Sequence, residues 1–223
     1  MQNNAVILYG PPGSGKGTQA YLLGKKRGLN NIDTGSILES IVHDPKNKND
    51  AFIQEQRKRF DGGELCDPDW VLKIFLQEIK YFAKCGMGII LSGSLRTKEE
   101  TFDKPHGEGV LDLLVNLYGK ENLYFFHIAV SEKESITRNS KRKICSVCGA
   151  SAMPGVTSCA VCRGKLRKRK LDVPRVIKHR YEIFKEETLP VIRTLEEKGY
   201  NMHTVNGALK PYQVFQAIDA WLS

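Results

Sequence analysis

The chain lacks the features of a membrane or secreted protein. None of the apolar runs in its 223 residues approaches the length that crosses a bilayer. The opening residues MQNN have neither the basic segment nor the long apolar segment of a secretion signal. We therefore expect a cytoplasmic protein with no membrane partner. The length suits one α/β domain with inserts, which can bury a core without disulfides.

Aromatic residues are missing from the most basic stretches. The formal net charge is +9, and six of the eight residues in 163–170 are lysine or arginine. Proteins that bind single-stranded nucleic acid usually interleave such charges with aromatic side chains on which bases stack. Phosphorylated small molecules also demand positive charge. We therefore expect a small phosphorylated partner and no nucleic acid, with a zinc-ribbon nucleic-acid binder as an alternative.

One glycine-rich segment carries the strongest functional signal. Residues 10–18 read GPPGSGKGT and stand between an apolar run, 5–9, and a helix-like stretch that starts at Gln19. A strand, a glycine loop and a helix form the context of a phosphate-binding loop, whose backbone N–H groups curl toward an anion. Lys16 adds a full charge for the outer phosphates, and Thr18 offers a hydroxyl to phosphate or metal.

Apolar runs alternate with helical patterns along most of the chain. This alternation predicts an α/β fold with a parallel sheet flanked by helices. Asp67 and Pro68 mark the start of one helix, and Pro211 starts the last one, with Phe215 and Trp221 on its inward side. The predicted strands are 5–9, 88–91, 123–130 and 200–205, with a short fifth strand near 29–32.

Two stretches, 33–65 and about 141–172, show neither a strand pattern nor the pattern of a packed helix. Both stand between core strands, so we interpret them as inserted subdomains. The predicted division is a core of residues 1–32, 67–140 and 173–223, a first insert of residues 33–66, and a second insert of residues 141–172.

Four of the six cysteines form two pairs with metal-binding spacing. Cys145 pairs with Cys148, and after ten intervening residues Cys159 pairs with Cys162. Two Cys-x2-Cys pairs can hold one zinc ion in a tetrahedral four-thiolate site, with an iron–sulfur cluster as the alternative. Disulfides are rare in the reducing cytoplasm, and no histidine accompanies the quartet. We therefore expect structural Zn²⁺.

The glycine-rich loop continues into Gly17-Thr18-Gln19, and in this form it resembles the loop of the adenylate kinase family. Further motifs follow in the family's order over nearly the whole chain. Residues 33–36 read DTGS where the family has serine-threonine-glycine-aspartate, and residues 92–97 read SGSLRT where it has aspartate-glycine-phenylalanine-proline-arginine-threonine. The other matches are Gly63-Glu64-Leu65 at the end of the first insert, Arg138 and Arg142 before the second, and Arg169, Asp172 and Arg180 after it.

This resemblance implies a P-loop kinase core with a monophosphate-binding insert and a zinc lid. It also implies a monomer that catalyses ATP + AMP ⇌ 2 ADP, with Mg²⁺ bound to ATP. Such a transfer needs two phosphate chains held in line and matched by positive charge.

The resemblance assigns roles to particular residues. Arg138 is expected to stack on the donor base, and Arg96 to clamp the acceptor phosphate. The expected catalytic residues are Lys16, Arg96, Arg142, Arg169 and Arg180. The expected ATP site is Gly13, Ser14, Gly15, Lys16, Gly17, Thr18, Arg138 and Arg142. The expected AMP site is Thr34, Leu38, Glu64, Leu65, Cys66, Gly93, Arg96, Glu100, Arg169 and Arg180.

Several positions depart from the family pattern. Glu39 stands where the family has an arginine for the acceptor phosphate, and Ser92 where it has an aspartate that orients magnesium-bound water. Asp33 and Ser36 look like an exchange of the family's serine and aspartate. Glu100 replaces the glutamine that reads adenine, and an ionised carboxylate only accepts hydrogen bonds. A kinase of another monophosphate such as GMP, and a weakly active nucleotide-binding sensor, are therefore the alternatives.

Overall fold

The computed structural model describes residues 4–102, 109–147, 151–152, 155–168 and 171–222. Within this part of the chain, five parallel strands form one sheet in the order β2-β3-β1-β4-β7. All five predicted strands are confirmed, to within two residues at either end. The strands are β1 (Ala5–Tyr9), β2 (Asn30–Ile32), β3 (Ile89–Ser92), β4 (Leu123–Ala129) and β7 (Met202–Asn206).

Strand β1 lies in the middle of the sheet. Its Ile7 pairs with Leu91 of β3 on one side and with Phe125 of β4 on the other. Every residue of β1 is buried, because helices cover both faces of the sheet, and this explains the unbroken apolar run. The glycine-rich loop follows the carboxyl end of this central strand.

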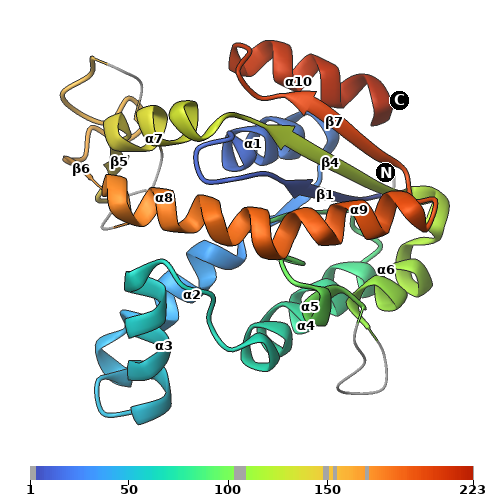
Figure 1. Ribbon diagram of the computed structural model, residues 1–223, viewed down its shortest axis with the longest axis horizontal. Helices are drawn as coiled ribbons and strands as arrows, with labels where there is room; N and C mark the ends of the chain where they lie inside the picture. Colours follow the sequence, from blue (N-terminus) through green and yellow to red (C-terminus); the bar gives the residue numbers. More distant parts are fainter. Residues whose placement is uncertain (1–3, 103–108, 148–150, 153–154, 169–170, 223) are drawn as a thin grey trace.

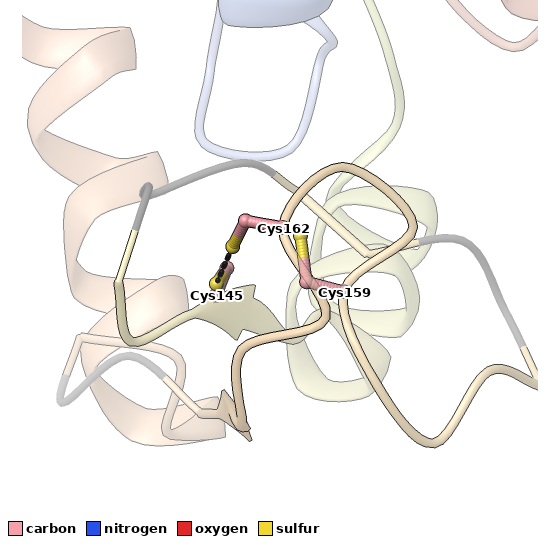
Figure 2. A group of neighbouring side chains, drawn as sticks. All are labelled: Cys145, Cys159 and Cys162. Carbon is pink, nitrogen blue, oxygen red and sulfur yellow. Dashed lines mark hydrogen bonds between the residues drawn. The ribbon is translucent and has the colours of Figure 1, made fainter.

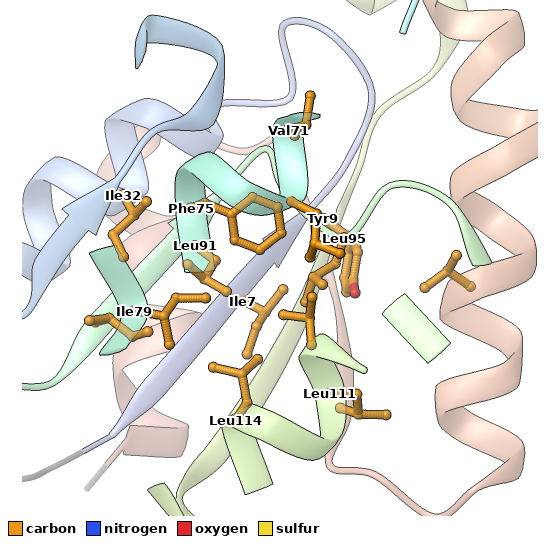
Figure 3. Close-up of a cluster of buried hydrophobic side chains, with 14 of the residues drawn as sticks. Ile7, Tyr9, Ile32, Val71, Phe75, Ile79, Leu91, Leu95, Leu111 and Leu114 are labelled. Atoms are coloured by element: carbon orange, nitrogen blue, oxygen red, sulfur yellow. The ribbon is translucent and has the colours of Figure 1, made fainter. Parts of the chain in front are cut away.

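The helices form two layers, one on each face of the sheet (Figure 1). The larger core joins Ile7 to Phe75 and Leu114 on one face (Figure 3). The smaller core joins Leu8 to Leu23 and Val214 on the other. The helices of the core are α1 (Lys16–Arg27), α4 (Pro68–Lys84), α5 (Lys98–Phe102), α6 (Val110–Tyr118), α7 (Glu132–Lys141), α8 (Pro174–Ile183), α9 (Leu189–Glu197) and α10 (Pro211–Asp219).

The helices predicted to begin at Pro68 and Pro211 are confirmed, but the inward orientation of Trp221 is wrong. Helix α10 ends at Asp219, and the next three residues form a tighter 3-10 turn. This turn buries Leu222 and leaves Trp221 54% exposed. The indole instead stacks on the His203 ring at a centroid distance of 3.7 Å.

The stretch 33–65 contains two packed helices, so the expectation of no helical pattern there is wrong. They are α2 (Thr34–Val42) and α3 (Ala51–Gly62), and a short 3-10 helix (Pro45–Asn47) lies between them. Aspartate side chains cap both helices, because Asp33 accepts from the Ser36 N–H and Asp50 from the Ile53 N–H. Each helix buries only about three residues, and so narrow a stripe is easily missed in a sequence.

The cysteine-rich stretch has little regular structure in its described residues. Strands β5 (Ile144–Cys145) and β6 (Leu166–Arg167) form a two-stranded antiparallel sheet. This small sheet lies at the end of α7 and α8, away from the main sheet (Figure 1). In the described parts of the chain, none of the helices is both long and apolar enough to cross a membrane.

Candidate active site

A cleft of about 1520 Å³ opens at the carboxyl ends of β1 and β3. Open α/β sheets commonly bind ligands at this edge. Segments far apart in sequence contribute to its walls: the glycine loop, both inserts, α7 and α8. The expected site residues that border it are Gly13, Gly15, Lys16, Gly17, Thr18, Thr34, Leu38, Glu64, Leu65, Cys66, Gly93, Arg96, Glu100, Arg138, Arg142 and Arg180. Ser14 is buried behind the loop, and Arg169 lies outside the described residues.

The glycine loop passes close to α7. A Cβ atom added to Gly13 would lie 2.6 Å from the Asn139 amide nitrogen, and the φ angle of Gly13 is +75°. The Ser135 hydroxyl donates to the Pro12 carbonyl at 2.6 Å. Helix α7 therefore holds the loop from outside, and the first N–H groups of α1 have no side-chain cap, which leaves them available to bind an anion.

Lys16 folds back over this loop. Its ammonium donates to the carbonyl oxygens of Gly10 at 2.6 Å and Pro11 at 3.0 Å. Burial is the largest cause that lowers the pKa of Lys16 to about 7, and the positive charges of Arg96, Arg180 and Arg142 contribute to the same shift. These positive charges repel one another at the inner end of the cleft, and a bound anion would relieve the repulsion.

The three arginines reach Lys16 from different elements. Arg96 follows β3, and its Nε donates to the Gly93 carbonyl at 2.7 Å. Arg142 directly follows α7 and forms a two-bond ion pair with buried Asp172, at 2.9 and 2.7 Å. Arg180 comes from α8. The tertiary structure thus brings together four positive charges that are separated by up to 164 residues in sequence, from Lys16 to Arg180.

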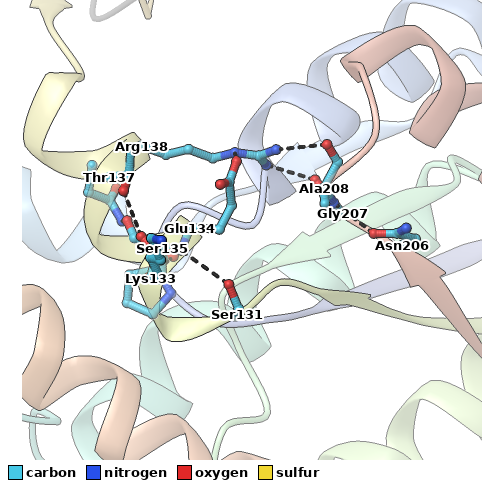
Figure 4. Close-up of polar contacts among 11 residues, drawn as sticks. Ser131, Lys133, Glu134, Ser135, Thr137, Arg138, Asn206, Gly207 and Ala208 are labelled. Carbon is cyan, nitrogen blue, oxygen red and sulfur yellow. Dashed lines mark hydrogen bonds and ion pairs between the residues drawn. The ribbon is translucent and has the colours of Figure 1, made fainter.

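Arg138 lies further out along the cleft. Its Nε pairs with Glu134 at 2.6 Å, and its terminal nitrogens donate to the carbonyls of Gly207 at 2.7 Å and Ala208 at 3.3 Å (Figure 4). These bonds lie in the plane of the guanidinium group and hold the loop after β7 against α7. A planar cation held in this way can stack on an aromatic ring through its face.

The first insert forms the opposite end of the cleft. The hydroxyl groups of Thr34 and Ser94 are hydrogen-bonded to each other, and Leu38 lies beside them in the wall. Burial raises the pKa of the Cys66 thiol to about 11, as expected of an apolar wall. The Glu64 carboxylate pairs with His179 of α8 at 2.7 Å, a link between insert and core that the sequence analysis missed.

Glu100 is 95% buried at this end of the cleft. Its Oε2 atom accepts the Arg96 backbone N–H at 2.7 Å, and its own N–H donates to the Thr97 hydroxyl at 3.1 Å. Burial raises the pKa of the Glu100 carboxyl, although the hydrogen bond and the charge of Arg96 oppose the shift.

Two other departures from the family pattern, Ser92 and Ser36, form side-chain hydrogen bonds. The Ser92 hydroxyl donates to Asn31 at 2.8 Å, and the Ser36 hydroxyl donates to Asp33 at 2.7 Å. Asp33 also acts on Lys16, since its negative charge raises the pKa of that ammonium. A carboxylate therefore remains at the phosphate end of the cleft, three positions earlier in the chain than in the family motif.

Three of the four expected metal ligands come together in the second insert (Figure 2). The sulfur atoms of Cys145, Cys159 and Cys162 all lie within 4.8 Å of one another, and those of Cys145 and Cys162 are 3.4 Å apart. Backbone N–H groups of Val147 and Val161 donate to two of these sulfurs. Such spacing suits thiolates about 2.3 Å from one zinc ion. Cys148 lies outside the described residues.

Sequence reasoning missed the residues that hold the site together. Ser135 and Asn139 fix the loop, and His127 lies on β4 close enough for Lys16 to lower its pKa, after the larger effect of burial. Their partners in the glycine loop are more than a hundred residues away in sequence, so no local motif could reveal these contacts.

Comparisons with known proteins agree with this geometry. The model of a family described as adenylate kinase matches residues 8–200. The chain is 32% identical over 219 residues to an adenylate kinase of Thermosipho africanus (strain TCF52B), with 96% of each chain covered. It is 30% identical over 223 residues to an adenylate kinase of Archaeoglobus fulgidus, with 97% of each covered. Over 210 residues it is 30% identical to an adenylate kinase of Thermococcus sibiricus, covering 91% of this chain and 86% of that protein.

Proposed function

The chain belongs to the adenylate kinase family of nucleoside monophosphate kinases, and on this premise we propose that it transfers the terminal phosphate of ATP to AMP, giving two ADP. The observation that carries the proposal is the convergence of Arg96, Arg142 and Arg180 around Lys16 in one cleft. A cleft with four cations from separate elements suits two phosphate chains better than one.

At the donor end, the loop N–H groups and Lys16 hold the ATP phosphates. Arg138 stacks its guanidinium face on the donor base, since its edge is already occupied by Glu134 and two carbonyls. Arg138 can therefore hold the donor base while the positive charges of the transfer site remain available to the phosphates.

At the acceptor end, Arg96 clamps the phosphate of AMP. Arg142, Arg180 and Arg169 surround the transferring group and match its charge as the second insert closes and excludes water. Asp172 keeps Arg142 oriented, because both of its carboxylate oxygens bind that guanidinium.

AMP is the first candidate for the acceptor, although Glu100 is an imperfect partner for adenine. The Glu100 Oε2 already accepts the Arg96 N–H, so Oε1 is the less occupied oxygen for a bond from a base. Adenine offers one amino group at this edge, whereas guanine offers two N–H donors that suit a whole carboxylate. GMP is the second candidate, because the buried Glu100 carboxylate accepts hydrogen bonds but cannot donate the hydrogen bond that adenine N1 needs.

Two metals complete the proposal. Mg²⁺ bound to ATP neutralises phosphate charge, and the Thr18 hydroxyl and the Asp33 carboxylate, which both border the cleft, are the oxygen ligands it prefers. Zn²⁺ is held by Cys145, Cys159 and Cys162 with Cys148 as the fourth ligand. Four thiolates require a reducing compartment, which supports a cytoplasmic location. We also propose that the chain divides into a core, a first insert of residues 33–66 and a lid of residues 141–172. We propose that the protein is a monomer.

A coupled assay with ATP and each of AMP, GMP, CMP and UMP tests the proposed activity. We expect turnover to be fastest with AMP. Faster turnover with GMP would show that GMP, rather than AMP, is the preferred acceptor. Tight ATP binding without turnover of any monophosphate would show that the protein is a nucleotide-binding sensor rather than a kinase.

A further inference from the structure

The turn between β3 and α5 holds Arg96 in an unusual backbone environment. Leu95, directly before it, has a φ angle of +56° although it is fully buried and is not a glycine. L-residues with large side chains rarely adopt this conformation, and the surrounding structure must enforce it. An interaction that stabilises this turn should therefore lie close to Leu95.

The Glu100 side chain is placed to do this. It reaches back from the first turn of α5, and its Oε2 accepts the N–H of Arg96 at 2.7 Å, one residue after the strained position. The Thr97 hydroxyl accepts the Glu100 N–H at 3.1 Å, so side chain and backbone bind reciprocally across the start of the helix.

The guanidinium of Arg96 depends on the same turn. Its Nε donates to the Gly93 carbonyl at 2.7 Å, and its Nη2 would lie 3.0 Å from any Cβ atom added to Gly93. Loss of the Glu100 contact would release the Arg96 backbone, and the side chain would lose its alignment toward the cleft.

We propose that Glu100 is a positioning residue, whose carboxyl oxygen fixes the Arg96 backbone and so aims its guanidinium at the acceptor phosphate. This inference rests on the proposed function only for the identity of that phosphate. It adds a second task to Glu100, independent of any contact with the base. What matters is an oxygen acceptor at the right reach, and neither the charge nor the base-reading edge is required.

This distinction separates conservative variants. Glu100→Gln keeps an oxygen at the same reach and removes the charge. Glu100→Asp keeps the charge but is one methylene shorter, so its oxygens retreat from the Arg96 N–H. Glu99→Gln, at an exposed position on the same turn, is the matched control for loss of a negative charge.

Two NMR measurements on the full-length protein test the proposal. The first is the proton shift and exchange rate of the Arg96 amide, which needs no ligand. The second is the dissociation constant of ribose 5-phosphate, which carries the phosphate without a base. We expect Glu100→Asp and Glu100→Ala to lose the downfield amide shift and to weaken the binding of ribose 5-phosphate by about tenfold, the effect of about one net hydrogen bond. Glu100→Gln and Glu99→Gln should keep both within about twofold.

An unchanged Arg96 amide in Glu100→Asp and Glu100→Ala would overturn the proposal. Its loss in Glu100→Gln would do the same, because charge would then be the essential property. Melting curves exclude a global loss of fold, and the Asp and Gln variants decide the outcome if Glu100→Ala does not fold. Absence of kinase turnover in the wild type would refute the proposed function, whereas the amide readout would still decide this inference.

Discussion

Helix α7 supports the proposed donor end of the cleft from outside, whereas the proposed acceptor end is supported from within its own turn. The glycine loop is held through Ser135 and Asn139, which lie more than a hundred residues further along the chain. The turn at Arg96 is held by Glu100, four residues away, against a strained Leu95. The glycine loop follows the family motif closely, whereas Glu39 and Glu100 depart from it at residues that we propose to bind the acceptor. On this proposal, acceptor preference can change without disturbing the phosphate-binding loop.

Replacing Lys16 should have the largest effect and should not depend on the acceptor. Lys16→Met removes the cation of the loop, and turnover should fall by about 10²-fold or more with every monophosphate, as for loss of preorganised charge. Steady-state kinetics measure this loss. Lys25→Met on the exposed side of the same helix is the control. Undiminished turnover of Lys16→Met would refute the assignment of the donor end.

Zinc removal should disturb the lid and spare the first insert. The cysteine-rich stretch has little apolar core, so its order should depend on the metal. Chelation, or Cys159→Ser, should lower the melting temperature by roughly 5 °C or more, since about 1 kcal/mol shifts a domain of this size by a few degrees.

Elemental analysis and calorimetry check this prediction about the lid. Cys85→Ser, at an exposed cysteine outside the cluster, should leave the melting temperature unchanged. Iron in place of zinc in the purified protein would contradict the assignment of the metal.

Glu100→Gln should change the binding of AMP at the acceptor end and leave the binding of ATP at the donor end unaffected. The amide can donate to adenine N1 while its oxygen still accepts from Arg96. The wild type should therefore bind AMP weakly, by about 1–3 kcal/mol for one poorly paired buried group, and the variant should lower the KM for AMP with little change for ATP. Initial rates with AMP and GMP measure both effects. Ordinary wild-type AMP affinity that worsens in Glu100→Gln would mean that Glu100 does not face the base.

The smallest expected effect is the uptake of at most one proton by Lys16 when a nucleotide binds at the donor end. The pKa of Lys16 falls from 10.5 to about 7 in the ligand-free protein, so most of this ammonium is deprotonated at pH 8.5. Bound phosphates should restore the proton. Uptake should therefore be large between about pH 7 and pH 10 and vanish near pH 6.

Calorimetry of ADP binding in two buffers of different ionisation enthalpy measures this uptake. The unfolded chain holds the Lys16 proton throughout this window, so Lys16 also makes the free energy of unfolding rise with pH. Lys16→Met should abolish the uptake. If the wild type takes up no proton at pH 8.5, Lys16 is already charged in the free protein.

Local patterns predicted much of the fold. Unbroken apolar runs predicted the fully buried strands β1 and β3, because a strand buried on both faces does not alternate between apolar and polar residues. Asp67 with Pro68 located the start of α4, and cysteine spacing predicted a four-cysteine site, of which the structure brings three described sulfur atoms together. The pattern failed for α2 and α3, whose buried stripes are narrow, and for Trp221, where a tighter turn changed the face.

The sequence by itself determined the glycine loop, the order of the strands along the chain and the residue types of the site. These depend on spacing within one turn or one strand, where backbone geometry leaves few choices. Only the tertiary structure decided which charges act on Lys16, which side chains hold the loop, and that Glu100 binds the Arg96 backbone. Burial and electrostatic fields arise between distant segments, so they exist only after the chain has packed.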